Sequence, residues 1–114
     1  LLSRPVAEEL AVDEADRAAV LAQLRDLGLL GEQSSERERV EALHRFLTWT
    51  PAKLIGVALA DAVGDRRAMH QLGSTSEYPN WRLPLADGVG RPVLLEDVMA
   101  SGRAAALART VNGR

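Results

Sequence analysis

A short apolar run at residues 54–59, Leu-Ile-Gly-Val-Ala-Leu, most constrains how this chain can fold. The run is too short for a stable helix, and a continuous apolar stretch of this length is typical of a strand buried on both faces. A strand needs neighbouring strands to pair with its backbone groups. No other segment of the sequence reads convincingly as a strand. The run therefore predicts a partner sheet that this sequence does not itself supply.

Two helical patterns precede the run. Residues 13–27 place apolar side chains on one stripe, and we expect Asp13 to cap this helix and Gly28 to end it. Residues 35–49 predict a second helix, because Ser35 is followed by a glutamate at the spacing of a capping box. A proline then stops this helix.

A long irregular segment dominates the second half of the chain. One helical turn is expected at residues 61–63 and a closing helix at 94–111. Between them, residues 64–93 show no sustained period and are punctuated by glycine and proline. An ordered loop of this length inside a small domain is usually functional. The predicted fold class is mostly α, with one short strand.

The lone strand and the long loop have a common explanation if further strands lie upstream. The sequence opens with Leu1 and Leu2 rather than methionine, and it shows no targeting segment. We therefore expect residues 1–114 to be one part of a larger domain, namely the tail of a barrel.

Composition excludes several classes of partner. Lys+Arg and Asp+Glu number 14 and 16 and are interspersed, leaving a formal net charge of −2, so no nucleic-acid partner is expected. The apolar run is far shorter than the roughly 20 residues of a membrane span, so no membrane association is expected. The two histidines lack the carboxylate spacing of a metal site. The absence of cysteine fits a cytoplasmic location, which is our expectation.

Two stretches of the sequence are similar to a known family. LHRFLTWTPAKLIGVALADAVGD at residues 43–65 is followed by MHQLGSTSEYPNWRLPL at residues 69–85. Together they resemble the C-terminal end of the amylomaltases, the 4-alpha-glucanotransferases, and the resemblance runs through residues 36–112. That family carries a helix ending in Thr-Pro, a last barrel strand, Asn-x-Pro-Gly-Thr and then Pro-Asn-Trp-Arg. Residues 79–82 keep the last motif intact, and it is a fairly specific signature.

The resemblance implies a (β/α)8 TIM barrel whose C-terminal part is this chain. The chain would supply the last helices, the last strand, a rim loop at residues 64–93 and the closing helix. In such barrels, function lies on loops at the carboxyl ends of the strands. The resemblance therefore implies that the rim loop borders a sugar-binding cleft. Its candidate substrate-binding residues are His70, Gln71, Gly73, Asn80, Trp81 and Arg82.

The chain departs from the family pattern in its loop and in its acidic residues. His70 and Leu72 stand where the family has asparagine and proline, so an imidazole replaces a carboxamide and the loop loses a constraint. Retaining glycosyl transfer also needs two carboxyl groups about 5 Å apart. No acid of this chain falls in a matching motif. We assign no catalytic residue and expect the isolated chain to be inactive.

The candidate loop residues and Trp49 also have structural explanations. Trp81 could stack on a sugar face, but packing beneath the loop is the favoured interpretation. Asn80 could bond a sugar hydroxyl or stabilise a turn. Arg82 could reach substrate or form a structural fork to carbonyls or to an acid. Trp49 lies beside apolar residues at a helix end and is expected in the core.

The functional hypothesis is a segment of a 4-alpha-glucanotransferase, a hexosyltransferase of glycogen and maltodextrin metabolism. The parent would transfer α-1,4-glucan segments between maltooligosaccharides or to glucose, and the family implies no cofactor. This part would close the barrel and border the sugar cleft, with the glucan and the upstream part of the barrel as its partners. The rival hypothesis is a free-standing helical protein-interaction module that descends from such a barrel and presents an apolar face to a partner protein.

Overall fold

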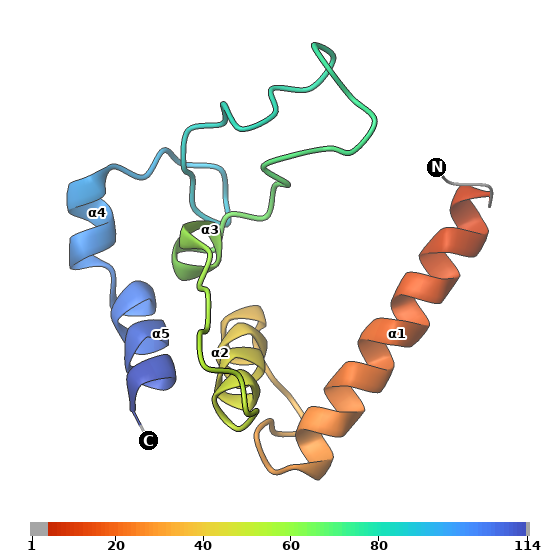
Figure 1. Cartoon of the computed structure of the whole chain (residues 1–114), viewed down its shortest axis with the longest axis vertical. Helices are drawn as coiled ribbons and strands as arrows, with labels where there is room; N and C mark the ends of the chain where they lie inside the picture. Colours follow the sequence, from red (N-terminus) through yellow and green to blue (C-terminus); the bar gives the residue numbers. More distant parts are fainter. Residues whose placement is uncertain (1–4, 114) are drawn as a thin grey trace. The chain divides into compact units, whose positions relative to one another are not determined.

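The computed structural model describes residues 5–113, and its regular structure is helical. The helices are α1 (Val6–Asp26), α2 (Glu36–Thr48), α3 (Leu59–Val63), α4 (Leu95–Ala100) and α5 (Gly102–Asn112), shown in Figure 1. The chain divides into two compact units, Leu1–Pro51 and Ala52–Arg114. Leu1 and Leu2, on which the expectation of a longer protein partly rested, lie outside the described residues. Within residues 5–113, no helix combines the length and apolar character that crossing a membrane requires.

Helix α1 is longer than the sequence predicted. It begins at Val6, directly after Pro5, whereas Asp13 was the expected cap. Proline fixes the backbone just before the first turn, and the residues that follow are good helix formers, so nothing delays the start. Asp13 instead accepts a hydrogen bond from Nη2 of Arg17 at 2.9 Å, one turn further along the helix. The helix end agrees with the prediction, because Gly28 follows it with φ of 76°.

Helix α2 confirms the predicted capping box. The hydroxyl of Ser35 accepts the backbone N–H of Glu38 at 3.1 Å, and the Glu38 carboxylate accepts the N–H of Ser35 at 3.3 Å. The placement of Trp49 was predicted wrongly. It follows the last turn of α2 and is 56% exposed, so it does not belong to the core of the described residues.

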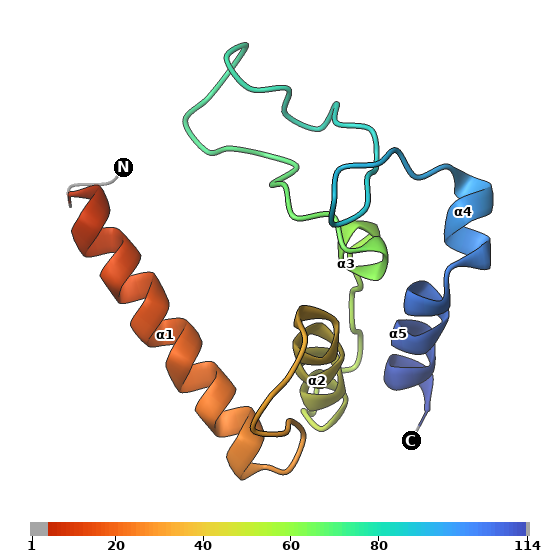
Figure 2. The ribbon, with the colours of Figure 1, turned by 180° about the vertical axis from the view of Figure 1, so that it is seen from behind.

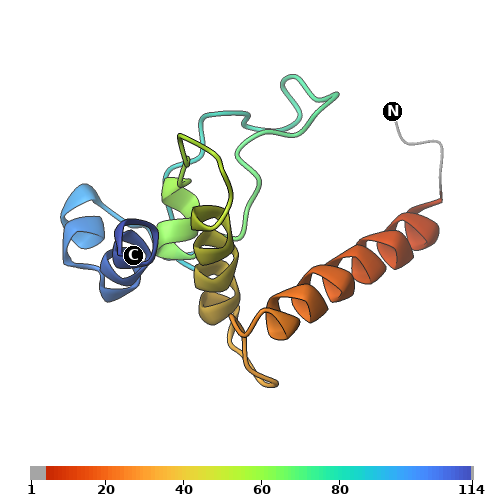
Figure 3. The ribbon, with the colours of Figure 1, turned by 60° about the horizontal axis from the view of Figure 1, so that its bottom comes forward.

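The first unit is a helical hairpin with a small core. Leu24, Leu30 and Ala42 are buried, and Phe46 packs against them. The two helices meet at the turn that joins them and diverge from it, as Figures 1 and 3 show. An apolar groove of about 510 Å3 lies between residues 19–24 of α1 and residues 43–47 of α2.

The strand predicted at residues 54–59 is not formed. Among residues 5–113 there is no strand, and the one isolated bridge joins Ala86 to Pro92. Residues 54–58 instead link α2 to α3 without regular structure, Leu54 is 91% exposed, and Leu59 opens α3. The physical reason is the one that made the run unusual in the sequence. A strand is stable only when it pairs with a neighbour, and the described residues offer none.

The second unit is organised around α3 and α5, which lie side by side in Figure 3. Gly64 ends α3 with φ of 85°, as the sequence predicted. The guanidinium of Arg103 on α5 lies beside this glycine, and its Nε donates to the carbonyl of Asp61 at 3.2 Å. The end of α3 is thus fixed by a side chain from the far end of the chain.

The prediction of a single closing helix at residues 94–111 is wrong, because this segment forms two helices, α4 and α5. Ser101 adopts an extended conformation between them, and its hydroxyl accepts the N–H of Ala104 at 3.1 Å. Serine competes for backbone groups in this way, and glycine at the next position is a weak helix former. A serine–glycine pair therefore ends one helix and begins the next.

Gly64→Ala is expected to destabilise the protein more than Gly90→Ala. Both glycines have positive φ, +85° and +88°, so each alanine costs roughly 1–2 kcal/mol of backbone strain. At Gly64 the new Cβ would also lie 3.0 Å from Nη1 of Arg103, whereas at Gly90 nothing lies within 4 Å. The guanidinium of Arg103 must then shift, which strains its hydrogen bond to Asp61. Thermal unfolding followed by circular dichroism measures the difference, and equal shifts for the two variants would contradict this packing.

Between α3 and α4 the chain makes the long loop expected at residues 64–93. Figures 1 and 2 show it leaving the end of α3, making a wide excursion and returning to α4. This segment carries every residue that the sequence nominated for a site.

Candidate functional site

The base of the loop is closed by a buried carboxylate. The side chain of Asp65 is only 1% exposed. Its Oδ1 accepts the backbone N–H and the Nε of Arg67, both at 3.0 Å, and its Oδ2 accepts Nη2 of Arg67 at 2.9 Å. The same Oδ2 accepts the N–H of Ala86 at 3.0 Å, and Nη2 of Arg67 also donates to the carbonyl of Pro84 at 2.7 Å. We call these four residues the clasp, because they tie the start of the loop to its return.

The clasp keeps the carboxyl group of Asp65 ionised. The guanidinium of Arg67 holds the pKa of Asp65 well below its usual range, and the N–H groups of Arg67 and Ala86 add to this effect. Burial acts in the opposite direction, because it disfavours the charged form. Hydrogen bonding to the charged form prevails here, so Asp65 remains an anion throughout the physiological pH range.

The stability that Asp65 contributes is expected to disappear in acid. Its pKa is lower in the folded chain than in the unfolded chain, so the unfolded state takes up the proton more readily as pH falls. The contribution is complete above the ordinary value of 3.8 and declines as pH falls below it. Melting temperatures of the wild type and Asp65→Asn should therefore differ most near neutrality and converge below about pH 4. A difference that stays constant down to pH 2 would contradict the assignment.

Above the clasp, further hydrogen bonds connect the two legs of the loop. The backbone N–H of Trp81 donates to the carbonyl of Met69 at 2.7 Å. The hydroxyl of Tyr78 donates to the carbonyl of Ala68. The loop therefore has a defined shape although it contains no regular structure.

Asn80 uses its carboxamide within the loop. Its Oδ1 accepts the N–H of Gln71 at 2.7 Å, and its Nδ2 donates to the hydroxyl of Ser74 at 2.9 Å and to the carbonyl of Thr75 at 3.3 Å. Both amide hydrogens are thereby engaged. Asn80 shapes the turn around Gly73, whose φ is 81°.

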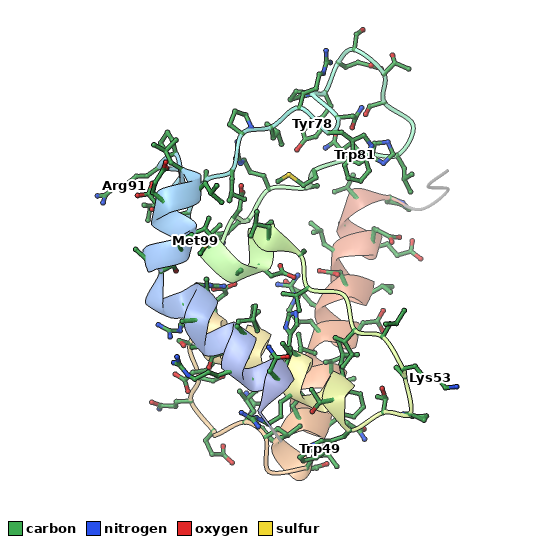
Figure 4. The ribbon with its side chains drawn as sticks, turned by 60° about the vertical axis from the view of Figure 1, so that its left-hand side comes forward. Trp49, Lys53, Tyr78, Trp81, Arg91 and Met99 are labelled. Carbon is green, nitrogen blue, oxygen red and sulfur yellow. The ribbon has the colours of Figure 1, made fainter. Side chains whose placement is uncertain are left out.

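Trp81 does not pack beneath the loop, so the favoured interpretation of this residue was wrong. It is 75% exposed, and its φ of 60° is unusual for a bulky residue. Its indole stacks on the imidazole of His70, with ring centroids 5.2 Å apart and an interplanar angle of 15°. Figure 4 shows Trp81 and Tyr78 on the loop between α3 and α4. A strained backbone that presents an exposed aromatic ring is typical of a functional position.

The remaining nominated side chains are exposed. Gln71 and Arg82 lie on the surface, and neither side chain has a hydrogen bond or ion pair among residues 5–113. The structural fork that was one of the two alternatives for Arg82 is thus not found in this part of the chain. The structure brings His70 and Trp81 into ring contact and links Gln71 to Asn80 through the backbone of the former. Their role in binding sugar stays a prediction.

Three residues that organise the loop were missed by the sequence reasoning. Asp65 and Arg67 form the clasp, and Tyr78 bridges the legs. One signal was available, because an acid directly after the helix-ending Gly64 and close to arginine often closes a turn. Nothing in the sequence indicated that its partners would include residue 86.

The acidic and histidine side chains of the described residues form no metal site, and the acids of the loop have structural partners. Within residues 5–113, no group of three or more His, Asp or Glu side chains is arranged to hold a metal ion. The acids nearest the loop have structural partners: Glu77 accepts the hydroxyl of Thr75 at 2.8 Å, and Asp87 accepts the N–H of Arg91 at 2.9 Å.

Comparisons with known proteins show what this chain resembles. No family model matches it. It is 53% identical over 113 residues to the 4-alpha-glucanotransferases of Mycobacterium tuberculosis and Mycobacterium bovis. The alignment covers 97% of this chain but 16% of each relative, so the chain spans about a sixth of their length.

A solved structure gives the same result. The crystal structure of amylomaltase from Corynebacterium glutamicum matches with a TM-score of 0.86 and 32% sequence identity, covering 96% of this chain and 17% of that one. The similarity thus extends beyond the two stretches, residues 43–65 and 69–85, that carry the resemblance in the sequence. The resemblance predicted from the sequence is confirmed: over nearly its whole length, this chain is similar to one segment of the 4-alpha-glucanotransferases, the amylomaltases.

Proposed function

We propose that this chain is the C-terminal part of the (β/α)8 barrel domain of a 4-alpha-glucanotransferase, and that residues 54–58 form the last barrel strand once the upstream strands are present. The 53% identity to the mycobacterial enzymes supports the family assignment. The exposure of the apolar segment supports the proposal that it pairs with an upstream strand. Leu54 is 91% exposed, and the segment has no neighbouring strand among residues 5–113. Pairing with an upstream strand would satisfy its backbone and cover its side chains.

Within that enzyme the loop at residues 64–93 borders the sugar cleft. The observation that carries this proposal is the exposed, stacked indole of Trp81. An aromatic face offers a sugar ring apolar contact area at low entropic cost, while nearby polar groups fix the hydroxyls. Gln71 and Arg82 supply such groups, because their side chains are exposed and unengaged within the described residues.

The other nominated residues shape this surface. His70 supports the indole from behind by ring stacking, and Gly73 and Asn80 form the turn beside it. The chain contributes no nucleophile and no acid/base group. We place the enzyme in the cytoplasm, where it transfers α-1,4-glucan segments between maltooligosaccharides without a cofactor. The carboxyl groups that perform the transfer belong to upstream parts of the barrel.

A hybrid enzyme tests the proposal. In it, this chain replaces the aligned 113-residue segment of the Mycobacterium tuberculosis enzyme. We expect the hybrid to disproportionate maltotriose, because at 53% identity the replaced segment should pack against the upstream barrel as the original one does. The control is the same enzyme with the segment deleted, which should be inactive. A hybrid that folds cooperatively but transfers no glucosyl units would contradict the proposal.

A second candidate function is the helical interaction module, and the apolar groove between α1 and α2 is the observation that favours it. Leu43 and Leu47 on its rim are each 40% exposed. The barrel proposal accounts for the same groove as a surface covered by upstream helices. An inactive hybrid together with a chain that unfolds cooperatively as a monomer would favour the module.

A further inference from the structure

The clasp at the base of the loop contains none of the residues nominated for sugar contact, but it joins the two legs of the loop that carry them. Asp65 and Arg67 stand at the start of the loop, and Pro84 and Ala86 stand at its return. Asp65 and Ala86 are 21 positions apart in sequence, and one carboxylate closes the segment between them into a loop.

The connection from the clasp to Trp81 is short on both legs. Arg67 lies two residues before Met69, whose carbonyl accepts the N–H of Trp81 at 2.7 Å. Pro84, the other end of the clasp, lies three residues after Trp81. The clasp is the most deeply buried of the links between the legs, because the carboxylate of Asp65 is 1% exposed whereas Trp81 and Gln71 lie on the surface.

We propose that Asp65 is a positioning residue for sugar binding, acting through Arg67 and the two legs of the loop to hold the His70–Trp81 stack in place. This inference rests on the proposed function of the loop, and it adds a residue that does not itself touch the sugar. Because Asp65 stays ionised throughout the physiological pH range, its hydrogen bonds to Arg67 and Ala86 do not depend on pH within that range.

Alternative roles for Asp65 fit the structure less well. A catalytic carboxylate must be accessible to substrate, whereas both oxygens of Asp65 are engaged by Arg67 and Ala86 and its side chain is buried. A purely local turn-closing role, like that of Asp87, would involve only near neighbours. The Oδ1 of Asp87 accepts the N–H groups of Val89 and Arg91, two and four residues away. Asp65 differs because it spans the loop.

Asp87 therefore provides a matched control for the kinetic test. In the hybrid enzyme, Asp65→Asn should raise KM for maltotriose and lower kcat/KM on the order of 10- to 100-fold, as expected when binding groups are misplaced. Asp87→Asn should stay within about twofold of the wild type, because asparagine keeps an oxygen that can accept the N–H groups of Val89 and Arg91 in this local turn. If Asp65→Asn folds poorly, Arg67→Gln serves instead, since the Arg67 side chain is 41% exposed.

A double variant separates positioning from general destabilisation. If Asp65 acts through Trp81, the losses caused by Asp65→Asn and Trp81→Ala should overlap, so that the double variant is little worse than the more damaging single one. Full multiplication of the two effects in kcat/KM would overturn the proposal. Unchanged kinetics for both Asp65→Asn and Arg67→Gln would overturn it as well.

Hydrogen exchange gives a readout that does not depend on activity. In the hybrid enzyme, Asp65→Asn should accelerate amide exchange in peptides covering residues 67–86, while Asp87→Asn should leave residues 67–82 protected. If Trp81→Ala proves kinetically silent but exchange still rises in Asp65→Asn, the loop is held as described and the sugar-binding function fails. If exchange does not rise, the positioning role itself is wrong.

Discussion

The isolated 114-residue chain is expected to show no transfer of glucosyl units above background, whereas the hybrid enzyme should be active. Retaining transfer needs a nucleophile and an acid/base carboxyl about 5 Å apart on either side of the anomeric carbon. Around the loop, the carboxylates of Asp65, Glu77 and Asp87 are held in structural hydrogen bonds. No acid in the sequence of this segment falls in a motif that matches the catalytic acids of the family.

Maltotriose disproportionation measured by product chromatography tests this expectation. The assay uses chain purified from a host that lacks its own 4-alpha-glucanotransferase, with an inactive irrelevant protein carried through the same purification. Transfer that scales with the amount of purified chain would show that a catalytic pair exists within these residues.

The same chain should also be weakly stable and prone to associate. Its exposed apolar side chains include Leu54 at 91% and Leu72 at 90%. The unpaired segment at residues 54–58 adds backbone groups that a partner strand would otherwise bind. Sedimentation and thermal unfolding at micromolar concentration measure both properties. A sharp, reversible transition of a monomer would show a self-sufficient domain.

Trp81→Ala in the hybrid enzyme is expected to lower kcat/KM roughly 10-fold, which corresponds to about 1.4 kcal/mol of lost contact with the sugar. Stability should change by less than about 0.5 kcal/mol, because this side chain is mostly exposed. This expectation reverses the one that follows from burial beneath the loop, where removing a core aromatic would cost about 3–5 kcal/mol of unfolding free energy. The 75% exposure of Trp81 among residues 5–113 favours the first expectation, and the melting temperature of the variant hybrid decides between the two.

Val89→Ala is the matched control for Trp81→Ala. Val89 is 78% exposed and lies on the return of the same loop, but outside the segment tied to the stack. Its replacement should leave both the melting temperature and kcat/KM unchanged. His70→Asn is a third variant for comparison, because it removes the imidazole that stacks on Trp81 and leaves the indole in place. A large fall in melting temperature for Trp81→Ala, with transfer reduced only in proportion to folded protein, would contradict a sugar-stacking role.

The local features of the helices were readable from the sequence because they depend on near neighbours. Ser35 with Glu38, and the glycines at positions 28 and 64, act within one turn of the helix that they begin or end. The family resemblance was readable for a similar reason, since Pro-Asn-Trp-Arg is a contiguous motif. The break at Ser101 is also a local feature. It was not predicted, because the apolar pattern continues across Ser101 and indicated one helix.

The orientation and support of the loop were decided only by tertiary structure. Whether Trp81 faces inward or outward depends on a backbone at φ of 60° and on the distant carbonyl of Met69, neither of which has a sequence signature. The partner of Asp65 at residue 86 lies beyond the range of any local pattern.

The apolar run at residues 54–59 shows the same division most clearly. The sequence by itself determined that this run must be covered, because its composition is apolar whatever its surroundings. Only the tertiary structure could decide whether it becomes a strand, because strand pairing is a property of two segments. Within residues 5–113 the second segment is missing, so the run stays unpaired.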